Sequence, residues 1–241
     1  APPDALNAAL IWHGLPAAPS AKLETPLNCL LLRTAHGTAL IDTGMGSDAQ
    51  PGTGNLVTNL AAAGWNREEV DLVILSHAHP DHIGGCLDAA GEPAFPRARY
   101  MLSEAEWRHW MEVSGAGRPR AVLEQLRAHI ELIAPENEVL PGVRALAAPG
   151  HTPGQLALRI ESGLSRMLYT ADAVAHPIHL EHPDWNIKAD SDRAQAIATR
   201  KHLLARAVAE DARLFVYHFP FPGLYRLAWD GGVWCASPDS A

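Results

Sequence analysis

Short apolar runs alternate with longer helical patterns along most of this chain. Two such runs, 28–33 and 38–42, flank His36-Gly37 and predict a β-hairpin. Ser103 precedes a helical pattern, and Glu106 three residues later completes the sequence of a capping box. Further strands are expected at 72–76, 98–102, 143–148, 156–160, 167–170, 214–217, 224–229 and 233–235, and helices at 56–63, 104–113, 120–132 and 192–209. The alternation predicts one α/β domain over residues 1–241, with residues 1–26 as an N-terminal extension or a truncated first strand.

Composition and charge narrow the classes of partner. The 241 residues are 47% hydrophobic and 19% charged, as in an ordinary globular domain with its own core. The 27 acidic residues exceed the 19 basic ones and give a net charge of −8, so nucleic acid is not expected as a partner. No apolar run approaches the ~18 residues of a membrane span, so we expect no membrane association.

The cysteines and the first residues bear on the compartment. Three widely spaced cysteines (Cys29, Cys86 and Cys235) favour reduced thiols over a disulfide framework. The opening APPDAL contains no cationic stretch followed by an apolar one, so a cytoplasmic location is expected. The chain does not begin with Met, which leaves a periplasmic location after removal of a leader as the alternative.

Histidine and aspartate residues gather directly after expected strands. The stretch LSHAHPDHIGGC (75–86) places three histidines and an aspartate behind an apolar run. Asp42, His151, Asp172 and His218 each follow another expected strand. Ligands of α/β proteins collect beyond strand ends, so we expect these side chains to converge. Imidazole and carboxylate together suit zinc, iron, manganese or cobalt.

The spacing of these residues favours two metal ions. His77 and His79 lie two apart, so on an extended turn both can face one ion, while Asp81 and His82 face a second. Two ions ~3.5–4 Å apart need a shared carboxylate, and Asp172 is the isolated acid available to bridge them. The expected cofactor is a pair of divalent ions, Zn²⁺ first, with Fe, Mn or Co as alternatives.

Taken in chain order, these motifs resemble the metallo-β-lactamase superfamily. They extend over residues 27–235 and are His77-Ala-His79-Pro-Asp81-His82 with Gly84-Gly85, Gly150-His151-Thr152-Pro153-Gly154, Thr170-Ala171-Asp172 and His218. The resemblance implies a four-layer αββα sandwich, the metallo-β-lactamase fold, with a binuclear metal centre at one edge. It also implies one metal on His77, His79 and His151, the other on Asp81, His82 and His218, and Asp172 between them. Asp42, in Ile41-Asp42-Thr43-Gly44, would steady the histidines by hydrogen bonds or would only cap the turn before Gly44.

Other segments are similar to a narrower group, the methyl parathion hydrolase-like branch of lactonases and arylesterases. These segments are 102–110 (LSEAEWRHW), 182–185 (HPDW), 190–192 (DSD), Arg200 and 218–223 (HFPFPG). The likeness implies metal-dependent hydrolysis of lactones or aryl esters, and in some members of phosphotriesters. Two departures stand beside it. The better-known acyl-homoserine lactonases carry a tyrosine where this chain has Ala175, and members of the branch carry a strand before the region of residues 6–15.

The resemblance also implies a mechanism and a class of substrate. A hydroxide bridging the two ions would attack a carbonyl or phosphoryl centre, because paired cations lower the pKa of water from ~15.7 toward ~7. Asp172 and Asp81 are the catalytic candidates, with Asp81 carrying the proton to the leaving group. The expected substrate is a small apolar or aromatic ester or lactone. Five aromatic residues are candidate walls of its pocket, with core packing as the alternative for each: Trp107, Trp110, Trp185, Phe219 and Phe221.

Other hypotheses stay open. One is another hydrolase of the same superfamily, either a glyoxalase II-like thioesterase or a β-lactamase. A second is a non-catalytic or redox metal-binding member, against which the intact set of seven ligands argues. His176, His179 and His182 could mimic ligands but are expected to be solvated loop residues. Many relatives pair into dimers, so a homodimer is an alternative, although no interface is visible in the sequence.

Overall fold

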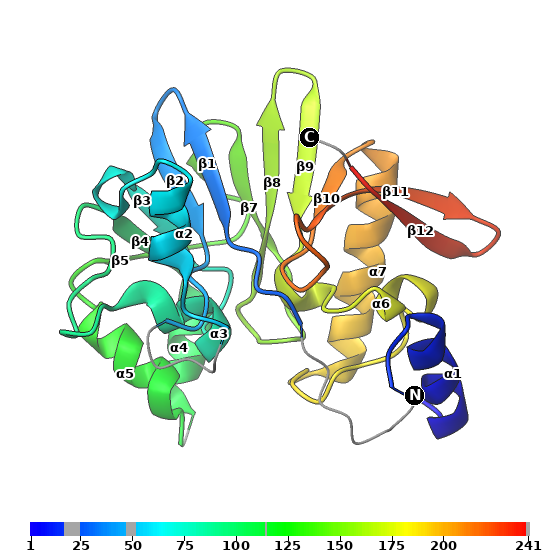
Figure 1. The fold of residues 1–241 in the computed structure, drawn as a ribbon. Coiled ribbons are helices and arrows are strands. Elements are labelled where there is room, and N and C mark those ends of the chain that lie inside the picture. Colours follow the sequence, from blue (N-terminus) through cyan, green and yellow to red (C-terminus); the bar gives the residue numbers. More distant parts are fainter. Residues whose placement is uncertain (17–24, 47–51, 114, 240–241) are drawn as a thin grey trace.

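The structure is a computed structural model that describes residues 1–16, 25–46, 52–113 and 115–239. Two β-sheets lie face to face in the middle of the molecule, and helices cover the outer side of each sheet (Figure 1). This is the four-layer αββα sandwich that was expected from the sequence. The chain builds the first sheet and its helices before the second, so each half of the sandwich comes mainly from one half of the sequence.

The first sheet contains five strands in sequence order, namely β1 (Leu30–Thr34), β2 (Gly37–Ile41), β3 (Leu72–Ile74), β4 (Arg99–Ser103) and β5 (Ile130–Ile133). β1 and β2 form the expected antiparallel hairpin, and β2 to β5 pair in parallel. The helical elements of this half are α2 (Leu56–Ala62), η1 (Arg67–Glu69), α3 (Pro80–Ile83), η2 (Gly84–Cys86), α4 (Glu104–Glu112) and α5 (Gly117–Gln125).

The second sheet contains seven strands, in the order β12-β11-β10-β9-β8-β7-β6. Their bounds are β6 (Glu138–Leu140), β7 (Val143–Ala147), β8 (Leu156–Ser162), β9 (Ser165–Tyr169), β10 (Arg213–Phe215), β11 (Leu224–Asp230) and β12 (Val233–Pro238). The helical elements are η3 (Ala171–Ala173), α6 (Ile178–Glu181) and α7 (Arg193–Ala209). The pair β9 and β10 is parallel, and α7 forms part of the connection between them.

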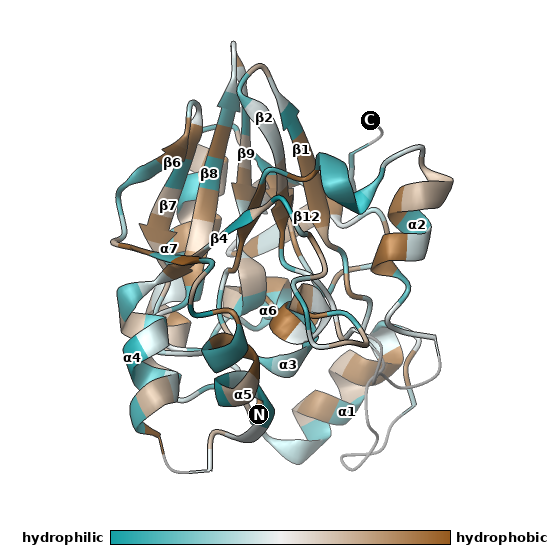
Figure 2. Cartoon of the chain, turned by 90° about the vertical axis from the view of Figure 1, so that its left-hand side faces the viewer, coloured by the Kyte–Doolittle hydropathy of each residue, from teal (hydrophilic) through white to brown (hydrophobic). Residues whose placement is uncertain are grey.

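Side-chain alternation along the strands decides which core each residue enters. In β2, Leu40 belongs to the core under the helices of the first half, with Leu60 of α2. Its neighbours Ala39 and Ile41 belong to the core between the sheets, with Leu158 of the second sheet. Successive strand residues point to opposite faces, so a strand buried on both faces is apolar throughout. The strand β3, with the sequence LVI, is buried at all three positions. Figure 2 shows brown, apolar segments on β1, β7 and β8 as well, interrupted by polar residues.

The helix expected over 120–132 was wrong at its end. The helix α5 ends at Gln125, and Ile130–Ile133 forms β5 instead. The sequence IELI fits either period over so short a stretch, so the pattern alone does not separate helix from strand. Parallel pairing with β4, which places Tyr100 opposite Ile130, decides the outcome in favour of the strand.

The segment expected as an extension or a truncated strand contains a helix. Residues Pro3–Trp12 form α1, which packs through Ala9 and Leu10 against Ile178 of α6. Figure 1 shows α1 beside α6, next to the second half of the molecule. The first residues of the chain therefore lie close to the segment that follows η3.

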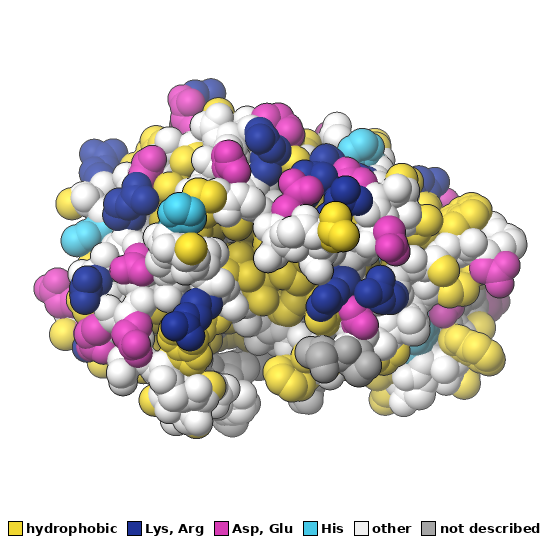
Figure 3. Space-filling view, turned by 90° about the horizontal axis from the view of Figure 1, so that it is seen from above, with side chains coloured by type: hydrophobic (Ala, Val, Ile, Leu, Met, Phe, Trp, Pro, Cys, Tyr) yellow, Lys and Arg dark blue, Asp and Glu magenta, His cyan; other side chains and the backbone are white. Residues whose placement is uncertain are grey.

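The surface carries side chains of both charges, and the cysteines are not bonded to one another. On the face shown in Figure 3, Lys and Arg side chains lie among Asp and Glu side chains. Cys29, Cys86 and Cys235 are free thiols, with Cys86 in the core. Among the described residues, we find no helix with both the length and the apolar character that crossing a membrane requires.

Candidate metal centre

Seven side chains from four separate segments converge at one end of the sandwich. The turn from β3 into α3 supplies four of them, and the others come from the loop after β7, from η3 after β9 and from the loop after β10. They fall into two groups whose ligand atoms lie within 4.8 Å of one another: His77, His79, His151 and Asp172, and then Asp81, His82 and His218. These are the seven residues that the sequence singled out.

Imidazole nitrogens meet at the centre of the first group. His77 Nε2 lies 3.0 Å from His79 Nδ1, which in turn lies 2.8 Å from His151 Nε2. An ion with tetrahedral bonds of about 2.0–2.1 Å would space its ligand atoms by roughly 3.3 Å. The three nitrogens are thus close to the spacing that one zinc ion requires.

The carboxylate of Asp172 touches both groups. Its Oδ2 lies 3.2 Å from His151 Nε2 and 3.3 Å from His218 Nε2. Its Oδ1 lies 3.1 Å from His82 Nε2, yet neither of these two atoms has a hydrogen-bond partner. Both atoms are buried, and leaving them unpaired would cost free energy. Their position is that of ligand atoms aimed at a common cation, so the residues present would fit metal ions, with Asp172 in contact with both ligand groups.

Hydrogen bonds on the far side of four imidazoles fix which nitrogen faces the centre. The Nδ1 atoms of these rings lie 2.7–3.1 Å from their partners, which are Asp42 for His82, Asp190 for His151, Ser76 Oγ for His77 and the carbonyl of Pro26 for His218. Each Nδ1–H donates outward, so each Nε2 is free to bind metal.

The electrostatics of the cluster centre on Asp172. Burial raises the pKa of this carboxyl, but His218 and His82 outweigh burial and hold the pKa well below its ordinary value. Burial lowers the pKa of His151, but the negative charge of Asp172 and its hydrogen bond have a larger effect than burial and raise that pKa to about 9. Burial and the charge of His82 hold the pKa of His77 well below its usual range. The cluster is therefore an acid shared among several bases, in which protons and metal cations compete for the same sites.

Asp42 holds the second group from behind. Its backbone has φ +57°, in the left-handed region. Its Oδ2 accepts hydrogen bonds from His82 Nδ1 at 2.7 Å, from Ser76 Oγ at 2.7 Å and from the hydroxyl of Tyr169, while Oδ1 accepts from the Ser76 N–H at 2.8 Å. The hydrogen-bonding alternative that the sequence left open is the arrangement observed.

Two carboxylates to which the sequence assigned no role at the site also support it. Asp190 Oδ1 lies 3.0 Å from His151 Nδ1, and the wholly buried Arg200 lies 3.7 Å from the other carboxylate oxygen. Glu106, expected only in a capping box, accepts hydrogen bonds from residues of two ligand loops. Ser103 does cap α4 by accepting from the Glu106 N–H, but the Glu106 side chain turns toward the site instead of closing the box. The sequence signal for Glu106 was its position three residues after the helix cap Ser103. That position fits a capping box as well as a carboxylate that supports the site, so it did not separate the two roles.

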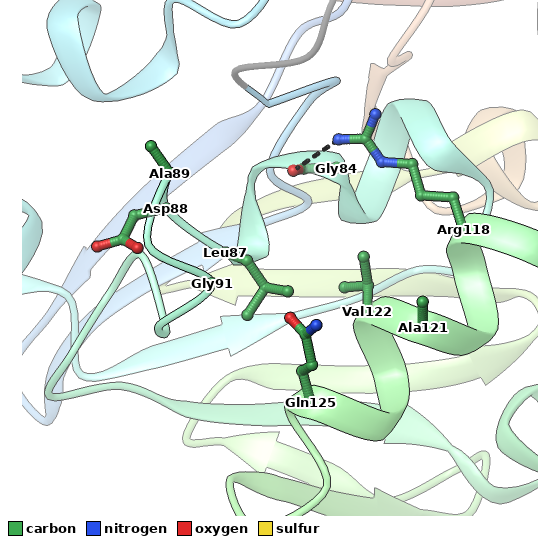
Figure 4. Close-up of a pocket in the computed structure, with 9 residues that line it drawn as sticks. All are labelled: Gly84, Leu87, Asp88, Ala89, Gly91, Arg118, Ala121, Val122 and Gln125. Atoms are coloured by element: carbon green, nitrogen blue, oxygen red, sulfur yellow. Dashed lines mark hydrogen bonds between the residues drawn. The ribbon is translucent and has the colours of Figure 1, made fainter.

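The turn after His82 is packed too closely for side chains. A Cβ on Gly84 would lie 2.1 Å from the carbonyl oxygen of Met45, so only glycine fits there. Arg118 of α5 donates a hydrogen bond to the carbonyl of Met45 at 3.2 Å. It donates another to the carbonyl of Gly84 at 3.5 Å, which Figure 4 shows. The cavity of about 280 Å³ drawn in that figure contains none of the seven ligands and lies behind their turn.

A cavity of about 360 Å³ opens onto the ligands themselves. It is lined by Thr25, His79, Pro80, Asp81, His151, Asp172, Ala175, His176, Ile187, Ala189 and His218. The expectation that His179 is a solvated loop residue was wrong, because it lies in α6 and is only 4% exposed. His176 does lie in a loop, where it is half-buried and lines this cavity. Its Nδ1 accepts the Ile178 N–H at 3.2 Å, so the neutral ring carries its proton on Nε2. Burial holds the pKa of His176 at about 4, which keeps the ring neutral.

The five candidate aromatic walls lie elsewhere, since none of them lines this cavity. Trp107 packs against the core under the helices of the first half, and Phe219 is buried in the core beside α7. Trp185 stacks on His182 with ring centres 3.9 Å apart, and Phe221 is 87% exposed. Trp110 comes nearest the metal ligands, with its ring 5.6 Å from that of His79. Core packing or another surface, rather than the ligand cavity, accounts for each position.

Comparisons with known proteins find several metal-dependent hydrolases that the chain resembles. The family model described as metallo-beta-lactamase superfamily matches residues 24–218. N-acyl homoserine lactonases of a Bacillus species and of Bacillus cereus are 31% and 32% identical over 175 and 176 residues, which is 64% of this chain. The match spans 66% of those lactonases, just under two thirds of their length.

Solved structures with the same fold superpose on the whole of this chain. AidC, described as a dizinc quorum-quenching lactonase in complex with a product, N-hexanoyl-L-homoserine, superposes with a TM-score of 0.91 at 29% identity. That match covers 100% of this chain and 87% of AidC. A hydrolase named AbOPH has a TM-score of 0.90 at 22% identity, covering 100% of this chain and 88% of that one, and shows the fold alone.

Proposed function

The chain belongs to the metallo-beta-lactamase superfamily, and from that premise we propose that it is a two-metal hydrolase that opens lactone rings. N-acyl homoserine lactones are the first substrates to test. The observation that carries the proposal is the bridging position of Asp172, whose two oxygens contact imidazoles of both ligand groups. The lactonases among the similar proteins support the choice of reaction.

Two divalent ions are proposed at this site, with zinc first. One would be held by His77, His79 and His151, the other by Asp81, His82 and His218, with Asp172 between them. Neutral imidazole and carboxylate are the donors that zinc prefers in hydrolytic sites, and the dizinc neighbour supports the same choice. When bound, the ions would supply a water of lowered pKa and polarisation of the substrate carbonyl.

Asp81 is the ligand placed to move a proton. Its side chain is 29% exposed, against 6% for Asp172, and it lines the cavity. One oxygen, Oδ2, lies 3.5 Å from His218 Nε2, which leaves the other directed away from that contact. We infer that this carboxylate takes the proton of the attacking water and passes it to the ring oxygen as the carbon–oxygen bond breaks. The product is a hydroxy acid.

The cavity favours small aliphatic lactones. Its volume of about 360 Å³ lies at the lower end of the ~300–1,000 Å³ typical of ligand pockets. Its apolar lining is small and aliphatic and includes Ala175, Ile187 and Ala189. Among the residues that the structure describes, the aromatic rings that line it are those of histidines. Aryl esters and phosphotriesters therefore have less support as substrates than lactones. They are still included in the assay below, because segments of the sequence are similar to the methyl parathion hydrolase-like branch.

The experiment is a matched set of kcat/KM measurements on the metal-loaded protein. The substrates are N-hexanoyl homoserine lactone, dihydrocoumarin, p-nitrophenyl acetate, methyl paraoxon, S-lactoylglutathione and a penicillin. We expect preference for the lactones, with loss of activity after chelation and in Asp172→Asn. If the protein preferred the thioester or the penicillin, the proposal of a lactonase would be wrong, and another hydrolase function of the superfamily would take its place. Activity that survives both chelation and Asp172→Asn would overturn the two-metal proposal.

A further inference from the structure

Glu106 is a wholly buried carboxylate on α4 that faces four hydrogen-bond donors. Its Oε1 accepts from the Ala78 N–H at 3.0 Å and from Trp110 Nε1–H at 2.6 Å. Its Oε2 accepts from the Thr152 hydroxyl at 2.6 Å and from the Gly154 N–H at 3.1 Å. The side chain is 0% exposed, so protein groups alone satisfy this carboxylate.

The four donors belong to the elements that carry one of the two ligand groups. Ala78 lies between His77 and His79, so its N–H fixes the backbone from which both imidazoles project. Thr152 directly follows His151, and Gly154 completes the same loop. Two loops that lie 72 residues apart at His79 and His151 are thus tied to the same carboxylate.

Two further contacts tighten this arrangement. Trp110, held by Oε1, packs its ring at a steep angle against the ring of His79. A Cβ on Gly154 would lie 2.0 Å from the Glu106 backbone nitrogen, so the loop of His151 rests directly on α4. The carboxylate therefore acts on the backbone of both loops and, through Trp110, on one imidazole ring.

The other ligand group is supported by different residues. His82 is held by Asp42, and His218 donates to the carbonyl of Pro26 at 2.9 Å. Asp81 receives support from Tyr217, whose hydroxyl donates to the Asp81 carbonyl at 2.6 Å. Within the described part of the chain, none of the four hydrogen bonds of the Glu106 carboxylate reaches these three ligands. Ser76 does link the two halves, because its hydroxyl lies 3.1 Å from His77 Nδ1 and donates to Asp42, but the contacts of Glu106 are confined to the half of His77, His79 and His151.

We propose that Glu106 is a positioning residue for one half of the centre, the half formed by His77, His79 and His151. Losing its carboxylate weakens the metal held there and leaves the metal held by Asp81, His82 and His218 largely unaffected. The inference rests on the proposed two-metal function. Its physical basis is that groups which orient metal ligands typically change metal affinity by roughly 10–100-fold when they are removed.

Glutamine cannot replace this glutamate, although it has the same shape. An ionised carboxylate accepts at both oxygens, whereas an amide presents one oxygen and two N–H donors. Because each oxygen of Glu106 meets two donors, either orientation of the amide places its NH₂ against donors. At Oε2 the Thr152 hydroxyl can turn to accept, but the Gly154 N–H cannot.

The test compares Glu106→Gln with Glu104→Gln, the same change two residues earlier on α4. Glu104 is exposed and forms an i,i+4 ion pair with Arg108, its one ion pair among the described residues, so it makes a matched control. Metal-free protein would be titrated with Co²⁺ while its visible absorption is followed, and zinc content would be measured after dialysis at limiting metal. These readouts do not depend on activity. Far-UV circular dichroism and urea unfolding would establish that each variant is folded.

We expect two ions per chain in the wild type and in Glu104→Gln. In Glu106→Gln we expect one ion bound as in the wild type and one bound about 10–100-fold more weakly. If Glu106→Gln does not fold, Thr152→Val serves instead, because it removes one donor and leaves the carboxylate. The valine variant should show the same selective loss, but smaller.

Two results would overturn the inference: both ions bound by Glu106→Gln with wild-type affinity, or both weakened equally. Failure of the proposed function would look different, because the wild type itself would bind fewer than two ions. The role of Glu106 would then be tested by the affinity for the single bound ion. That affinity should be lower in Glu106→Gln and unchanged in Glu104→Gln.

Discussion

Replacing Asp42 by asparagine is expected to weaken one metal site without preventing folding. Asp42 has φ +57°, a conformation that asparagine adopts more readily than most residues, so the backbone permits the change. If the amide oxygen takes the place of Oδ2, it keeps the hydrogen bonds from His82, Ser76 Oγ and Tyr169. The amide nitrogen then faces the Ser76 N–H, which loses its acceptor. The reverse orientation would lose three hydrogen bonds instead of one, so we expect the first.

The magnitude follows from that one broken contact and from the lost charge. A buried N–H without an acceptor costs about 1–3 kcal/mol, and the free energy of unfolding of the metal-free chain should fall by that amount. The negative charge behind His82 also disappears, which makes its Nε2 a weaker donor to metal. Loss of such a carboxylate partner typically lowers metal affinity roughly 10–100-fold.

The assay combines urea unfolding of the metal-free protein with a Co²⁺ titration. Asp71→Asn is the matched control, because Asp71 also accepts a backbone N–H, that of Thr38 at 2.9 Å. Asp71 is exposed, and this hydrogen bond does not involve a metal ligand. An amide oxygen can accept that N–H equally well. The reasoning is refuted if Asp42→Asn binds both ions within twofold of wild type, or if Asp71→Asn loses as much affinity.

Two further changes test the packing and the cavity. Gly154→Ala would bring a Cβ to 2.0 Å from the Glu106 nitrogen, and we expect a loss of about 1–3 kcal/mol in urea unfolding from overpacking; a loss below about 0.5 kcal/mol would contradict the close approach. His176→Asn keeps an acceptor for the Ile178 N–H but removes Nε2–H from the cavity, so kcat/KM for the homoserine lactone should fall about 2–10-fold with unfolding unchanged, as expected for one neutral hydrogen bond. An unaltered kcat/KM would show that this imidazole does not contact the substrate.

The sequence by itself determined the α/β class and the candidate ligands, and the resemblance of its motifs to a known family supplied the four layers. Ligand residues such as His77 and His79 stand in short contiguous motifs, because binding one ion demands particular atoms at fixed spacing. Strands buried on both faces are apolar throughout, which is why their runs could be recognised. The order of the motifs along the chain then carried the resemblance to the metallo-β-lactamase superfamily, and that resemblance implied the αββα fold.

Only the tertiary structure decided the rest. Whether residues 130–133 form helix or strand depended on pairing with β4, which a four-residue pattern does not encode. The roles of Glu106 and Asp190 depend on partners 46 and 39 residues away, Thr152 and His151. Whether an aromatic ring such as Phe219 lines a cavity or fills a core is likewise set by packing. Local sequence patterns indicate secondary structure and short metal-binding motifs. Contacts between residues that are distant in the chain form only when the sheets and helices pack against each other, so these patterns do not indicate them.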